Sequence, residues 1–228
     1  PILSARLHNP PEVAARLIED YRKASIPAAE AALESMAADN DEYVKFLKFQ
    51  GSMYKQSACV ALEFFAQKPD AEFIATEQQW EKAGYHLKHG QLGVIHEYQD
   101  GTMQEFFDFS QINSDKKPVV WSLTAENVHA VKKALELPEN MDFTAGLLHK
   151  YLTGQDIIDQ MNGMHIPRSQ AITFQTDYIN SVRAIIAGRL EVGGNRFGVT
   201  ADNTIFRTLT PEQQKKYLAA CLHAARTA

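Results

Sequence analysis

Aromatic, lysine and histidine side chains alternate with glycine-containing turns between Phe46 and Phe109. Exposed aromatic rings stack on the bases of single-stranded nucleic acid, and lysines hold its phosphates. The candidate stacking platforms are Tyr54, Trp80 and Tyr85. The candidate polar contacts are Lys55, Ser57, Lys68, Lys82 and Lys88, with His86 and His89 as auxiliaries. Together, these residue types indicate an interface for single-stranded DNA.

The same residues also admit a structural interpretation. Trp80 fits a core anchor between a helix and a sheet, because tryptophan is on average well buried. Tyr54 fits the core and the surface equally well, and Lys55 and Lys88 also fit a solvated surface. Under either interpretation, turns with positive φ are expected at Gly84, Gly90 and Gly93.

The sequence carries none of the motifs of a zinc protease, a phosphate loop or a serine nucleophile. His86 and His89 lie close to His96, but the first two fall on a predicted loop and the third on a predicted strand, which disfavours a metal triad. The run from Gly193 to Gly198 lacks the Lys-Ser/Thr ending of a phosphate loop and is interpreted as a connection. We therefore expect a protein that is not an enzyme and uses no metal or cofactor.

Composition indicates a globular protein. The chain has 228 residues, of which 45% are hydrophobic, enough for one large domain or two small ones. It shows neither a long apolar run nor a signal peptide, so we expect a cytoplasmic protein without a membrane partner. Cys59 and Cys221 are expected to be reduced thiols. The start at Pro1 suggests a processed product or part of a longer protein.

The net charge of −5 argues against a general polyanion binder, which usually carries a basic excess. Residues 1–44, 45–90 and 91–228 carry −4, +1 and −2. Binding of nucleic acid would therefore depend on a local groove and on base stacking.

Local signals predict most of the helices. A first helix should begin at Asn9-Pro10-Pro11-Glu12 and stop at Ser25-Ile26-Pro27, because proline inside a helix removes a hydrogen bond. Further helices are expected at about 28–38, 42–67, 77–82, 125–135, 144–153, 155–161, 169–190 and 211–226. The segment 42–67 is apolar on more than one face, which predicts a central helix or one broken near Gly51. Thr210-Pro211-Glu212-Gln213 reads as a capping box with proline at the first helical position.

Strands are expected at 72–75, 92–98 and 103–109, the last two joined by the turn Gln99-Asp100-Gly101-Thr102. The sequence thus predicts an α+β protein in which helices pack on a small antiparallel sheet, followed by an all-helical C-terminal half. The polar loop 113–118 suggests a boundary between a domain at 1–114 and a helical domain at 115–228.

Residues 42–123 resemble the N-terminal single-stranded DNA-binding domain of ArdC-type antirestriction proteins. The resemblance rests on Met53-Tyr54-Lys55-Gln56-Ser57, Gln67-Lys68-Pro69-Asp70-Ala71, Trp80, Gly84-Tyr85-His86-Leu87-Lys88-His89-Gly90-Gln91-Leu92-Gly93 and Phe107-Asp108-Phe109-Ser110-Gln111. It implies non-enzymatic binding of single-stranded DNA, for antirestriction or DNA handling, in a conjugative element, plasmid or phage. The family's tyrosine, asparagine and arginine are replaced here by Gln56, Val60 and Tyr85, which removes polar groups that would face DNA. A competing hypothesis is a module that docks other domains of a larger polypeptide or a host restriction factor.

Overall fold

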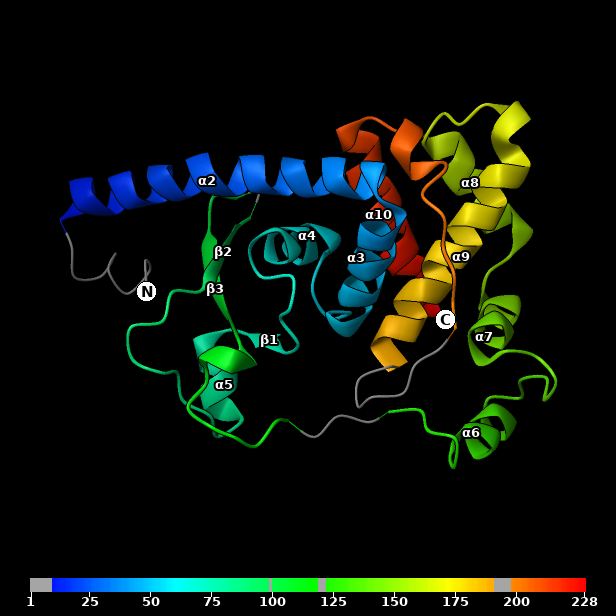
Figure 1. The fold of residues 1–228 in the computed structure, drawn as a ribbon, viewed down its shortest axis with the longest axis horizontal. Coiled ribbons are helices and arrows are strands. Elements are labelled where there is room, and N and C mark those ends of the chain that lie inside the picture. Colours follow the sequence, from blue (N-terminus) through cyan, green and yellow to red (C-terminus); the bar gives the residue numbers. More distant parts are fainter. Residues whose placement is uncertain (1–9, 99, 119–121, 191–197) are drawn as a thin grey trace. The chain divides into compact units, whose positions relative to one another are not determined.

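The computed structural model describes residues 10–98, 100–118, 122–190 and 198–228 (Figure 1). The chain forms two compact units: unit 1 comprises residues 1–32 and 60–119, and unit 2 comprises residues 33–59 and 120–228. The units interleave in the sequence, so that helices α2 (Pro11–Ala38) and α4 (Ala58–Gln67) contribute residues to both. A contiguous boundary at 114/115 stays a prediction, which separate expression of the two parts would test.

Unit 1 is built on a three-stranded antiparallel sheet with the strand order β1-β3-β2 (Figure 1). The strands are β1 (Ile74–Ala75), β2 (Val94–Glu97) and β3 (Met103–Asp108). Val94 lies opposite Phe106, and Ile74 lies opposite Asp108. The predicted hairpin is present, with Gly101 at a φ of 78° in its turn; Gln99 lies outside the described residues.

Helix α2 contributes the partner for the outer edge of β2. The Tyr21 hydroxyl accepts a hydrogen bond from the Ile95 N–H at 3.0 Å and donates one to the Ile95 carbonyl. Arg22 Nε donates to Glu97 Oε2 at 2.7 Å. An edge strand otherwise presents unpaired backbone groups, so the Tyr21 hydroxyl satisfies both backbone groups of Ile95 without adding another strand.

The predicted interruption of the first helix is wrong, because α2 continues through Pro27. Proline removes the hydrogen bond to the carbonyl of the residue four positions earlier, Lys23. Both residues are exposed, so water can reach that carbonyl and the cost of the missing bond is reduced.

Unit 2 is organised around helix α9 (Ala171–Leu190), which packs against helices α3, α7, α8 and α10 (Figure 1). Its other helices are α3 (Asn40–Ser52), α6 (Val128–Ala134), α7 (Phe143–Tyr151), α8 (Gly154–Gly163) and α10 (Pro211–Thr227). Short 3₁₀ helices are η1 (Phe109–Gln111) in unit 1 and η2 (Arg168–Gln170) and η3 (Phe206–Thr208) in unit 2. The α+β class and the helical C-terminal half are confirmed. The capping box at Thr210 is also confirmed.

The sequence predicted that segment 42–67 is either one central helix or a helix broken near Gly51, and the break is present. Helix α3 ends at Ser52 and α4 begins at Ala58. Near this break, α3 crosses α9 at very close range. A Cβ atom on Gly51 would lie 2.0 Å from the Ile185 carbonyl oxygen, and one on Gly188 would lie 2.1 Å from the Lys48 carbonyl oxygen. The two glycines therefore allow the helix backbones to touch, which brings the end of α9 close to the turn after α3.

Candidate nucleic-acid interface

The segment His86–Lys88 in unit 1 is fixed against residues 111–113. The Asn113 N–H donates to the His86 carbonyl at 2.8 Å, and the Lys88 N–H donates to the Gln111 carbonyl at 2.9 Å. Leu87, which forms an isolated β-bridge with Ile112, packs on the core of the unit. Because side chains alternate in extended backbone, His86 and Lys88 both project outward and are exposed. We call these two residues the basic row.

The turns on either side of the basic row contain glycine with positive φ, as predicted, at two of the three expected positions. Gly84 has a φ of 83° and Gly90 a φ of 75°. The positive φ expected at Gly93 is wrong: only the first two and Gly101 have positive φ among the described glycines. Gly93 is instead required by close approach, since a Cβ there would lie 2.4 Å from the Phe106 carbonyl oxygen.

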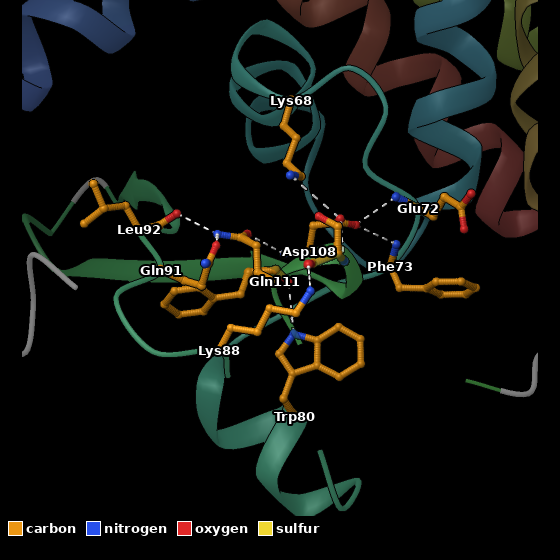
Figure 2. Close-up of polar contacts among 11 residues, drawn as sticks. Lys68, Glu72, Phe73, Trp80, Lys88, Gln91, Leu92, Asp108 and Gln111 are labelled. Carbon is orange, nitrogen blue, oxygen red and sulfur yellow. Dashed lines mark hydrogen bonds and ion pairs between the residues drawn. The ribbon is translucent and has the colours of Figure 1, made fainter. Parts of the chain in front are cut away.

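The capping box formed by Asp108 and Gln111 holds the backbone that pairs with the basic row. The Asp108 carboxylate accepts from the Ser110 N–H at 2.9 Å, and Gln111 Oε1 accepts from the Asp108 N–H at 3.0 Å. Gln111 Nε2 then donates to the Leu92 carbonyl at 2.7 Å (Figure 2). These bonds fix the strand end against which His86 and Lys88 are held.

Asp108 is buried at the centre of this network (Figure 2). Its carboxylate also accepts from the Glu72 N–H at 2.9 Å and the Phe73 N–H at 3.3 Å, and Lys68 Nζ lies 4.0 Å away. Burial by itself would raise the pKa of Asp108, but the hydrogen bonds from Ser110, Glu72 and Phe73 outweigh it and lower the pKa below its ordinary value. Lys68 is therefore directed at a protein carboxylate, which competes with a phosphate for its charge.

Trp80 is a core residue, with 4% of its surface exposed. Its indole Nε1 donates to the Phe107 carbonyl at 2.9 Å (Figure 2). Tyr85 packs edge-on against it at a centroid distance of 5.6 Å, and Phe109 lies 6.1 Å away. The faces of the indole are thus covered, so Trp80 is a core anchor rather than a stacking platform. Half-buried Tyr85 belongs to the same cluster.

Among the remaining predicted contacts in unit 1, Lys82, His86, Lys88 and His89 have exposed side chains. The ammonium group of Lys88 donates to the Ser110 carbonyl at 2.8 Å. Because an ammonium group has three donors, two remain for a phosphate.

Tyr54, Lys55 and Ser57 lie in unit 2, on the turn between α3 and α4. The Arg189 guanidinium carbon lies 4.2 Å from the centroid of the Tyr54 ring, and Lys55 Nζ lies 5.9 Å from it. Arg226 donates through Nε to the Tyr54 carbonyl and through Nη2 to the Gln56 carbonyl, each at 2.6 Å. The turn is therefore surrounded by three cationic side chains.

The ten predicted residues thus form two groups in different units. Val60 is buried in unit 1, and its side chain carries no polar group. Arg189 and Arg226 were absent from the sequence-based site, since Arg226 and Tyr54 are 172 positions apart. A local pattern carries no signal for such a contact.

The described residues offer no metal centre, and the buried thiol is not activated. Within the described ranges, no cluster of three or more His, Cys, Asp or Glu side chains is arranged to hold a metal ion. Burial raises the pKa of the Cys221 thiol well above its ordinary value, which disfavours the nucleophilic thiolate. None of the described helices has the length and apolar character needed to cross a membrane.

Comparison of the chain with protein-family models, with curated proteins and with solved structures gave no significant match.

Proposed function

We propose that this chain binds single-stranded DNA without catalysing a reaction, as an antirestriction or DNA-handling protein of a mobile genetic element in the cytoplasm. The observation that carries the proposal is the basic row, in which His86 and Lys88 point outward from a segment fixed by two backbone hydrogen bonds. Side chains on a fixed backbone lose less freedom on binding a phosphate chain. The resemblance of residues 42–123 to an ArdC-type domain supports the same function.

The structure restricts how such binding would work. Trp80 cannot stack on a base without leaving the core, and Lys68 faces Asp108. In unit 1 the proposal therefore relies on phosphate contacts from exposed Lys82, Lys88 and the two histidines rather than on an aromatic platform. Binding of this kind tolerates sequence changes in the DNA and depends strongly on salt.

The test is the polarisation of a labelled oligothymidylate, measured across salt concentrations with the wild-type chain and with Lys88→Gln. Each phosphate contact to a single strand contributes about 0.7 to the slope of log affinity against log salt, so the variant should lose about that much. Lys23→Gln is the matched control, because Lys23 is an exposed lysine on α2 that pairs with Glu19 at 3.5 Å.

Two results would contradict the proposal. One is the absence of oligothymidylate binding by the wild-type chain at low salt, which would favour a module that docks other protein domains. The other is a Lys88→Gln variant with unchanged affinity and slope. Thermal unfolding of the variant shows whether loss of the bond to the Ser110 carbonyl, rather than loss of charge, is responsible.

A further inference from the structure

We propose that the turn after α3 and the end of α9 form a nucleotide site in unit 2. Its residues are Tyr54, Lys55 and Arg189, which we call the Tyr54 clamp. The tyrosine would stack on a base through the ring face opposite Arg189, and the two cations would hold the attached phosphate. For a nucleotide within a DNA strand the inference rests on the proposed function, whereas for a free nucleotide it does not.

The first argument is the unpaired charge. Arg189 and Lys55 are exposed, and neither forms an ion pair with a carboxylate in the part of the chain that the structure describes. The protein has 28 acidic and 23 basic residues, yet these two cations lie on one ring with no acidic partner among the described residues. An anionic ligand would complete this arrangement.

The second argument is the geometry of Arg189. At 4.2 Å from the ring centroid, its guanidinium group is within the range of a cation–π contact. A guanidinium group held against a ring keeps N–H donors at its edge, where they can bind two phosphate oxygens at once. The C-terminal end of a helix carries a partial negative charge, so the last turn of α9 stabilises the Arg189 side chain and repels an anion. Binding of an anionic ligand would therefore depend on the side chains alone.

The third argument is preorganisation. The two 2.6 Å hydrogen bonds from Arg226 hold the backbone on either side of Lys55. The close crossing at Gly51 and Gly188 fixes the distance between the turn and α9. Arg226 is thus a positioning residue, while Tyr54 and Arg189 are the groups that would touch the ligand. An aromatic face beside a phosphate-binding edge matches the two chemical parts of a nucleotide.

The test uses the full chain at low salt with four probes: oligothymidylate, thymidine 5′-monophosphate, thymidine and inorganic phosphate. Affinities are measured by isothermal titration calorimetry and ligand-detected NMR. We expect Arg189→Gln to weaken binding of the monophosphate at least tenfold, and Arg189→Lys to restore it only in part. Arg168→Gln, which removes an exposed arginine from the same unit, is the control and should bind as the wild type does. Tyr54→Leu should weaken binding by roughly 5- to 150-fold, the equivalent of one base stack.

The probes distinguish the sources of the nucleotide. Binding of the monophosphate alone supports a free nucleotide, and binding of the oligothymidylate that is lost in Arg189→Gln supports a strand. The inference is overturned if no probe binds, if Arg189→Gln binds as the wild type does, or if inorganic phosphate binds as tightly as the monophosphate. Lys88→Gln reports separately on the proposed function, because its residue lies in unit 1.

Discussion

Replacing Gly188 with alanine should strongly destabilise unit 2. The added methyl group would lie 2.1 Å from the Lys48 carbonyl oxygen and 2.5 Å from the Lys48 Cα atom. Both neighbours are backbone atoms of α3, so no side chain can turn aside. Ordinary contact begins at 3.4 Å, and the helices would have to part by about 1.3 Å.

The cost follows from what that separation does to the packing. A gap of about 0.5–1 Å removes a quarter to a half of the dispersion energy of each contact across it. Overpacking of this kind costs about 1–3 kcal/mol or more, while alanine in a helix gains about 1 kcal/mol over glycine. Because the clash involves rigid backbone, the cost lies at the upper end of that range, so we expect a net loss of about 2 kcal/mol, which lowers the melting temperature by roughly 4–8 °C.

Urea unfolding followed by circular dichroism measures this loss. Gly154→Ala is the matched control, since Gly154 is also helical and has no atom within 4 Å of its added methyl group. That variant should unfold within about 1 kcal/mol of the wild type. The reasoning is refuted if Gly188→Ala is as stable as Gly154→Ala.

Four further variants test other parts of the structure. Asp108→Asn should be less stable at pH 7 by about 2–3 kcal/mol, because charged hydrogen bonds are lost. The pKa of Asp108 is lowered in the folded protein, so its contribution to stability is present above about pH 4 and disappears on further acidification. Urea unfolding at pH 3 should therefore show a smaller difference between the variant and the wild type. Trp80→Phe should lose about 2–3 kcal/mol in thermal unfolding, since it leaves the Phe107 carbonyl without its donor, and should leave oligothymidylate affinity unchanged. Gln50→Met should unfold in urea within about 1 kcal/mol of the wild type, because it removes both the 3.2 Å hydrogen bond from Gln50 Nε2 to the Leu218 carbonyl and the buried Gln50 Oε1, which has no hydrogen-bond partner among the described residues. His165→Gly should raise the free energy of unfolding by about 0.5 kcal/mol, measured as a slightly higher melting temperature, because His165 directly follows the C-cap of α8 with a φ of 57°.

Local signals were sufficient for many element boundaries. Thr210 forms the predicted capping box, and Asp100-Gly101 marks the predicted hairpin. In these cases the residues that determine the structure lie within four positions of one another, so their chemistry is visible in the sequence. The interruption predicted at Pro27 is wrong because the exposure that makes the missing hydrogen bond tolerable depends on the fold.

The candidate site was harder to predict because its parts come from distant positions. The pairing of Tyr54 with Arg189 requires α3 to cross α9, and nothing in either segment alone specifies that crossing. Trp80 had two interpretations with the same sequence signal. The hydrogen bond from its indole to the Phe107 carbonyl distinguishes them, and that bond depends on how α5 (Glu77–Lys82) packs on β3.

The residues on which the proposed resemblance rests are mainly those that hold unit 1 together. Trp80 anchors the core, Gly84 and Gly90 form the turns, and Asp108 with Gln111 closes the network beneath the basic row. A substitution among them that unfolds unit 1 would also abolish any binding, so loss of binding there says little about contact with DNA. Exposed side chains can change without such a cost. A chain can therefore keep these core and turn residues while its ligand changes. Only variants of exposed side chains test what the protein binds.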